Sequence, residues 1–291
     1  MTESIYVVLM GGLGNQMFQV AFGLALSRAL EKKLLLSPNR LSEQGNPRKI
    51  GWDSVLKNCL SLRSFEGAPQ NILPEDAIEK NWSVLKTGGV YLPGSLTLYG
   101  YFQHAMYFSG LQDELRVLFD CVSASRKEEL IHKYSLDSSK VVAVHFRFME
   151  IYNSGLAPNF TIDWKKCVPL DFYKKILKDY FYKKCDDTKC DDTKFILFHD
   201  SQYDISEWIT SLDNELGLGL GSSLMVCEED YEEMWIMGQC SDVICPTSTF
   251  SWWASYLGKT ERVYVPTPDW LEDSIGFYKL EMPNWIQVSR V

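Results

Sequence analysis

Three side chains that can do chemistry lie close together in the middle of the chain: His145, Arg147 and Glu150. They follow an apolar run, 141–144, which is typical of a buried strand in a parallel sheet. Ligands of open α/β sheets bind at the carboxyl ends of such strands. An imidazole, a guanidinium and a carboxylate at this place could hold an anionic ligand and move a proton. Alternatively, the three are ordinary surface residues just past a strand.

Two further apolar runs are followed by polar side chains in the same way. The run 195–198 leads to Asp200, and the run 243–245 leads to three hydroxyl residues before a predicted helix. Hydroxyl groups at the start of a helix either cap that helix or bind phosphate together with its backbone amides. The three hydroxyl residues are Thr247, Ser248 and Thr249.

A glycine-rich turn near the amino terminus is a candidate for a second binding edge. It contains Gly12 and Gly14, and it joins a strand predicted over 5–10 to a helix predicted over 17–30. Glycines allow the backbone to approach a ligand or to adopt a positive φ. The turn does not match GxGxxG, which argues against a dinucleotide site.

Two carboxamides, Asn15 and Gln16, follow this turn directly. Paired carboxamides at a strand end suit the hydroxyl groups of a sugar or the oxygens of a phosphate. A tight strand-to-helix turn without a ligand is the alternative interpretation.

Strands alternate with helices in both halves of the chain, which predicts an α/β fold with parallel sheets covered by helices. We place the domain boundary between 1–135 and 136–291, and we expect a loop over 149–159. Further strands are predicted over 34–36, 224–227 and 263–265, helices over 111–119, 171–182, 205–212 and 230–239, and a helix with a connector over 123–140.

The charge and composition of the chain exclude some classes of protein. The 291 residues carry a net charge of -9 and no basic block, so nucleic acid is not an expected partner. No secretory signal and no apolar stretch long enough to span a membrane is present. We therefore expect a cytoplasmic location, or a peripheral one at the inner membrane face.

The eight cysteines form no CxxC pair, so no metal site is expected. Cys227, Cys240 and Cys245 lie in or beside apolar runs, as reduced core cysteines do. The pentapeptide at 185–189 is repeated at 190–194, and we interpret this acidic repeat as a solvated loop.

Four stretches of the sequence resemble motifs of the bacterial α-1,2-fucosyltransferases of glycosyltransferase family 11. They occur in the family's order and span nearly the whole chain: 11–19, 100–103, 232–237 and 248–254. The resemblance implies a GT-B fold of two facing Rossmann-like domains. It also implies that GDP-L-fucose is the co-substrate, without a further cofactor or a metal. The acceptor would be a glycan with a terminal β-galactoside, fucosylated at its 2-hydroxyl with inversion during surface glycan or O-antigen synthesis.

The resemblance also implies roles for the candidate residues. The carboxyl-terminal domain would bind the donor, with Arg147 on the pyrophosphate and with His145 and Asp200 on the guanine or ribose. The hydroxyl residues would add hydrogen bonds to the phosphates: Thr247, Ser248 and Thr249.

The amino-terminal domain would lie on the acceptor side. Asn15, with the turn at Gly12 and Gly14, would face the reacting centre from this domain; these three residues would help to bind the donor, and Asn15 would also take part in catalysis. Glu150 would either take the proton of the acceptor hydroxyl or hold Arg147 in place.

The central motif departs from the family pattern His-x-Arg-Arg-Gly-Asp. Its second arginine is replaced by Phe148, its glycine by Met149 and its aspartate by Glu150. Three outcomes stay open: the α-1,2-fucosyl transfer of the family, transfer with another linkage or a related deoxysugar donor, and a catalytically silent nucleotide-sugar-binding protein.

Overall fold

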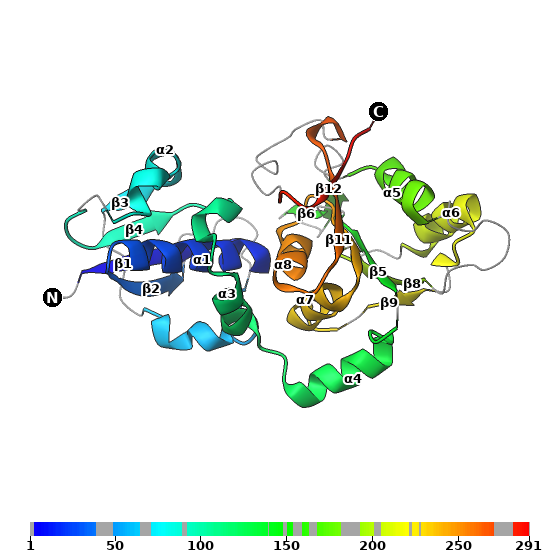
Figure 1. Cartoon of the computed structure of the whole chain (residues 1–291), viewed down its shortest axis with the longest axis horizontal. Coiled ribbons are helices and arrows are strands. Elements are labelled where there is room, and N and C mark those ends of the chain that lie inside the picture. The colour runs from blue at the N-terminus through cyan, green and yellow to red at the C-terminus, as the bar shows by residue number, and fades with distance from the viewer. Residues whose placement is uncertain are drawn as a thin grey trace. The chain divides into compact units, whose positions relative to one another are not determined.

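The computed structural model of the chain divides into two compact units, Met1–Cys121 (unit 1) and Val122–Val291 (unit 2) (Figure 1). Both units are α/β and each is built on a parallel sheet, so the expected fold class is confirmed. The structure describes residues 3–38, 49–64, 71–88, 92–138, 140–147, 150–153, 159–162, 168–181, 193–200, 205–220, 223–226, 228–270 and 282–290.

Unit 1 holds a four-stranded sheet in the order β2-β1-β4-β3, and all of its strand pairs are parallel. The helix after β1 begins four residues earlier than predicted, because Gly12 adopts an extended conformation and serves as its N-cap. The elements of unit 1 are β1 (Ser4–Leu9), α1 (Leu13–Ala29), β2 (Lys33–Pro38), η2 (Lys57–Leu62), β3 (Ile72–Pro74), α2 (Glu75–Leu85), β4 (Leu96–Tyr99), η3 (Ala105–Phe108) and α3 (Gln112–Phe119).

Helix α1 packs directly on β1 to form the core of unit 1. Val7 on β1 is fully buried, and a methyl group placed on Gly23 would lie 2.5 Å from its side chain. Phe22 on α1 stacks on Phe102 with their ring centroids 4.5 Å apart. This packing holds the amino end of α1 at the carboxyl edge of the sheet.

Unit 2 holds a six-stranded sheet in the order β12-β11-β10-β5-β8-β9, again with every strand pair parallel. Its elements are α4 (Ala124–Tyr134), β5 (Val141–Phe146), β6 (Glu150–Asn153), β7 (Asn159–Ile162), α5 (Leu170–Ile176), the π-helical turn η4 (Leu177–Phe181), β8 (Lys194–His199), α6 (Ser206–Leu216), β9 (Leu224–Met225), α7 (Asp230–Gln239), β10 (Asp242–Ile244), α8 (Thr249–Leu257), β11 (Arg262–Pro266), η7 (Pro268–Trp270) and β12 (Ile286–Val288).

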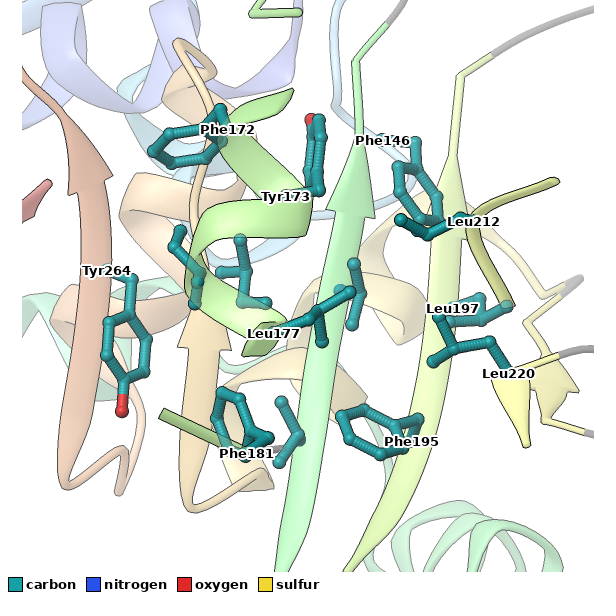
Figure 2. Close-up of a cluster of buried hydrophobic side chains, with 14 of the residues drawn as sticks. Phe146, Phe172, Tyr173, Leu177, Phe181, Phe195, Leu197, Leu212, Leu220 and Tyr264 are labelled. Carbon is teal, nitrogen blue, oxygen red and sulfur yellow. The ribbon is translucent and has the colours of Figure 1, made fainter. Parts of the chain in front are cut away.

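Helices cover both faces of the unit 2 sheet, with α5 and α6 on one face and α7 and α8 on the other (Figure 1). Figure 2 shows how aromatic side chains of α5 pack on the central strands; Tyr173 lies 4.8 Å from the ring of Phe146. Side chains alternate between the faces of a strand. Phe146 therefore points toward α5, and the preceding residue, His145, faces α8.

The backbones of α7 and of the residue that ends α8 are in direct contact at Gly238 and Gly258. A methyl group on Gly258 would lie 2.3 Å from the carbonyl oxygen of Gly238, and the amide of Lys259 donates to that same oxygen over 2.8 Å. Glycine is required at this crossing because no side chain fits.

The boundary between the units lies earlier in the chain than the predicted 135/136, because α4 is bound to unit 2. Arg126 on α4 pairs with Glu228 over 2.8 Å and with Glu232 over 2.9 Å. Both carboxylates are more than nine-tenths buried, so these pairs fix the helix to its own unit.

Several other expectations differ from the structure. The predicted loop 149–159 contains β6 and leads into β7, which pairs with it in an antiparallel hairpin. Among the helices and strands, β3, α2, β4 and β12 lacked a clear sequence signal.

The cysteine expectation is confirmed where the structure describes it, since Cys240 and Cys245 are buried and free. Cys227 and most of the repeated pentapeptide lie outside the described residues.

Candidate active site

The order of the strands makes one edge of the unit 2 sheet a candidate binding site. The chain moves outward from β5 to β8 and β9, then crosses back to β10 on the other side of β5. At such a switch point the loops diverge and leave a crevice beyond the carboxyl ends of the strands, where ligands of this sheet order bind. The candidate residues of unit 2 follow β8, β5 and β10, which are neighbours, so the structure brings them to one edge.

Arg147, just past β5, forms an ion pair with Asp200, just past β8. The two side chains are 27% and 24% exposed. A half-buried carboxylate lowers the cost of placing the guanidinium there and limits the directions in which it can point. A guanidinium has five N–H donors and a carboxylate has two acceptor oxygens, which are groups that can bind phosphate and hydroxyl groups.

His145 is the penultimate residue of β5 and so lies inside the strand, not in the loop that follows it. It is only 4% exposed, and its ring lies 5.9 Å from that of Phe250 on α8. Burial, together with smaller contributions from the neighbouring charges of Arg147 and His199, lowers the pKa of His145 to about 3. The imidazole is therefore neutral at pH 7.

The Nδ1 atom of His145 is buried and has no hydrogen-bond partner among the residues that the structure describes. Leaving a buried polar atom unpaired costs about 1–3 kcal/mol. A neutral ring held at this place could make one specific hydrogen bond to a ligand without adding charge.

Helix α8 begins at the same edge. The side chain of Ser248 caps it by accepting from the amide of Phe250 over 3.3 Å, so the capping interpretation is confirmed for this residue. Thr247 and Thr249 flank the cap and are partly exposed. The positive end of the helix dipole and these hydroxyls suit an anion.

Glu150 begins β6, three residues after Arg147. Its role as a base or as a holder of Arg147 stays a prediction. Asp200 already provides a carboxylate for Arg147. Phe148 and Met149 lie outside the described residues.

Unit 1 has a switch point of its own, between β1 and β4. Gly11 there has a φ of +76°, and Asn15 accepts a hydrogen bond from the side chain of Gln103 over 2.7 Å. A methyl group on Gly12 would contact nothing within 4 Å, and Gly14 is buried in the first turn of α1. The edge therefore combines open backbone with a pair of coupled carboxamides.

Gln16 does not face a ligand. It is fully buried, donates to the carbonyls of Gly11 and Lys49 over 2.8 and 3.0 Å, and accepts from the amide of Gly51 over 2.9 Å. These hydrogen bonds hold the turn that contains Asn15 in place.

Glu75 is a further residue of this edge that sequence analysis did not identify. It accepts hydrogen bonds from the backbone amides of Tyr101 and Phe102. An acidic residue in the first turn of a helix normally indicates only the helix dipole, so no local signal marks this long-range role.

These features define a Rossmann-type protein in which each parallel sheet has a candidate ligand-binding edge. The chain belongs to glycosyltransferase family 11: the family described as "Glycosyl transferase family 11" matches residues 4–289. The protein is therefore a glycosyltransferase.

Two relatives from Escherichia coli resemble nearly the whole chain. The O-antigen biosynthesis glycosyltransferase WbnK is 23% identical over 98% of this chain and 100% of its own length. An alpha-1,2-colitosyltransferase is 23% identical over 97% of this chain and 98% of its own.

Among solved structures, the fucosyltransferase NodZ from Bradyrhizobium is similar with a TM-score of 0.44 and 12% identity, covering 89% of this chain and 94% of that one. A family 9 glycosyltransferase from Veillonella parvula gives a TM-score of 0.46 and 12% identity over 99% and 86% of the two chains.

Within the described ranges, no three His, Cys, Asp or Glu side chains gather closely enough to hold a metal ion. None of the described helices combines the length and hydropathy that crossing a bilayer requires.

The lowered pKa of His145 predicts an acid-dependent loss of stability. The unfolded chain takes up a proton near pH 6.5, whereas the folded ring takes one up only near pH 3. Between these values stability falls by about 1.4 kcal/mol per pH unit from this residue alone. The pH dependence of the free energy of unfolding is measured by urea unfolding of the wild type and of His145→Gln at pH 7, 6 and 5. The variant should show the shallower dependence, and parallel curves would contradict the neutral buried ring.

Proposed function

We propose that the protein transfers L-fucose from GDP-L-fucose to the 2-hydroxyl of a terminal β-galactoside, with inversion, in surface glycan or O-antigen synthesis. The observation that carries this proposal is the ion pair of Arg147 and Asp200 at the switch point of unit 2, beside the amino end of α8. The relatives support it by their names, one through O-antigen synthesis and the other through the α-1,2 linkage.

Transfer breaks the bond between sugar C1 and a pyrophosphate oxygen. Negative charge grows on the departing GDP, so the protein must offer fixed donors to the phosphates. Arg147 can bind two phosphate oxygens at once, and its contact with Asp200 orients it before the donor arrives. Thr247, Thr249 and the first amides of α8 add hydrogen bonds to the same groups.

The nucleoside part of the donor would lie over β5 and β8. His145 offers a neutral nitrogen, and the second lone pairs of Asp200 suit the N–H edge of guanine or a ribose hydroxyl. Neither side chain adds net charge near the leaving pyrophosphate, because His145 is neutral and the charge of Asp200 is balanced by that of Arg147.

Inversion requires the acceptor hydroxyl to attack from the face opposite GDP, with a base to take its proton. Glu150 is the proposed base, since Arg147 already has Asp200 as its partner. Asn15, Gly12 and Gly14 of unit 1 are the proposed acceptor-side groups.

A second candidate function is the transfer of another sugar to the same hydroxyl. It is favoured by the relative named for colitosyl transfer and by the altered residues Phe148, Met149 and Glu150. The loss of the second arginine, at Phe148, also motivates a catalytically silent nucleotide-sugar-binding protein.

The proposed reaction is tested by incubating the protein with GDP-L-fucose and lactose, with and without EDTA. We expect release of GDP and formation of a fucosylated trisaccharide in both conditions, followed by mass spectrometry and NMR of the linkage. GDP release alone would indicate the wrong acceptor. No product together with GDP binding by calorimetry would favour another donor sugar or a silent binder, and neither product nor binding would contradict the proposal.

Replacing Arg147 by alanine should weaken GDP binding by about 10- to 100-fold, the loss typical of a charged hydrogen bond. It should lower kcat by a further ~100-fold, because the leaving charge is no longer stabilised. Calorimetry and initial rates measure the two effects. Arg116→Ala, which removes an exposed arginine paired with Asp113 in unit 1, is the control. Unchanged donor affinity in Arg147→Ala would refute the pyrophosphate role.

Replacing Glu150 by glutamine separates its two proposed roles. A lost base should cut kcat by about 100- to 10,000-fold and leave GDP affinity nearly unchanged. Weaker GDP binding would show instead that Glu150 positions Arg147. The exposed Glu128 on α4, changed to glutamine, is the matched control.

A further inference from the structure

The segment that follows β4, residues 100–103, has a strained backbone. Phe102 has a φ of +52°, in the left-handed region that a bulky side chain rarely adopts. Such a residue costs about 1–3 kcal/mol and persists only where its surroundings enforce it. The segment lies at the switch point of unit 1, where the sheet order places a ligand.

Two interactions enforce this conformation. The carboxylate of Glu75, at the start of α2, accepts from the amide of Tyr101 over 3.0 Å and from that of Phe102 over 2.8 Å. The ring of Phe102 is fully buried and stacks on Phe22. Gly100 permits the approach, because a methyl group there would lie 2.6 Å from a carboxylate oxygen of Glu75.

The result is that Tyr101 points outward while Phe102 points inward. Tyr101 is 42% exposed, and its ring lies beside Gly11. A methyl group on Gly11 would lie 3.1 Å from the Cε1 atom of Tyr101 and 2.6 Å from the side-chain Nδ2 atom of Asn15. Gln103 donates to Asn15 beside it. An exposed aromatic ring thus lies next to two side-chain carboxamides, and the backbone at Gly11 beside them has no room for a side chain.

We propose that Tyr101, Asn15 and Gln103 form the acceptor-sugar platform of unit 1, and that Glu75 is the residue that positions it. The C–H face of a pyranose would stack on the ring of Tyr101, as apolar surfaces do on aromatic side chains. The carboxamides offer both donors and acceptors to its hydroxyl groups. That the sugar is a β-galactoside rests on the proposed function.

Tyr101→Ala should raise the KM for lactose about tenfold and leave the KM for GDP-L-fucose unchanged, the loss expected for one stacking contact. Tyr101→Phe keeps the ring and should behave as the wild type. Tyr99→Ala removes a tyrosine of nearly equal exposure, 43%, at the end of the preceding strand β4 and should have little effect. An unchanged lactose KM in Tyr101→Ala, or an equal effect of Tyr99→Ala, would overturn the platform.

Glu75→Gln keeps the size of the side chain but replaces one of its two acceptor oxygens with a donor. It should raise the lactose KM severalfold, with GDP binding by calorimetry unchanged. Asp76→Asn, the next residue of α2 and exposed, is the matched control for loss of an acidic group at this helix start. If Glu75→Gln lowers the Tm but leaves the lactose KM unchanged, Glu75 stabilises the fold and does not position the platform.

The platform can be tested even if no transfer is found. Saturation-transfer NMR of methyl β-D-galactoside with the wild-type protein should show binding that Tyr101→Ala abolishes, while Tyr99→Ala retains it. Binding without transfer would leave the platform standing and contradict the proposed reaction. Equal signals in the wild type and Tyr101→Ala, or no signal in either, would contradict the platform.

Discussion

Every strand pair in the two main sheets is parallel, and this constraint decides where polar chemistry can occur. Parallel strands are covered on both faces, so their interiors must be apolar and their functional groups are confined to the ends. The six buried residues of β5 obey this rule except for His145, which is the penultimate residue of the strand. Because β8, β5 and β10 are neighbours, the groups after them meet at one edge although the sequence separates them widely.

Carboxylates position the functional groups in both units. Asp200 holds Arg147, Glu75 holds the backbone of Tyr101, and Glu228 with Glu232 holds Arg126 on α4. None of the three arrangements is local in sequence. The protein therefore uses long-range acidic contacts to fix groups that a strand end or loop alone would leave free to rotate.

The strands of unit 2 could be predicted because continuous apolar runs such as 141–144 and 195–198 are long enough to recognise. The region of β3 and α2 could not, since β3 is only three residues long and mostly exposed. The partners of the candidate residues could not be predicted either, for a different reason. Contacts such as Arg147 with Asp200, or Glu75 with Tyr101, depend on which strands become neighbours, and the side-chain pattern of each segment does not contain that information.

The glycine crossing of α7 and α8 has a consequence for how this protein can diversify. Gly238 and Gly258 bring α7 and the carboxyl end of α8 into backbone contact, while Thr247 and Thr249 are partly exposed at the opposite, amino end of α8. Variation in the two threonines, which are proposed to bind the donor, would leave this crossing undisturbed, whereas a side chain at either glycine would push the two helices apart. Directed evolution toward new sugar donors should accordingly randomise the former and preserve the latter.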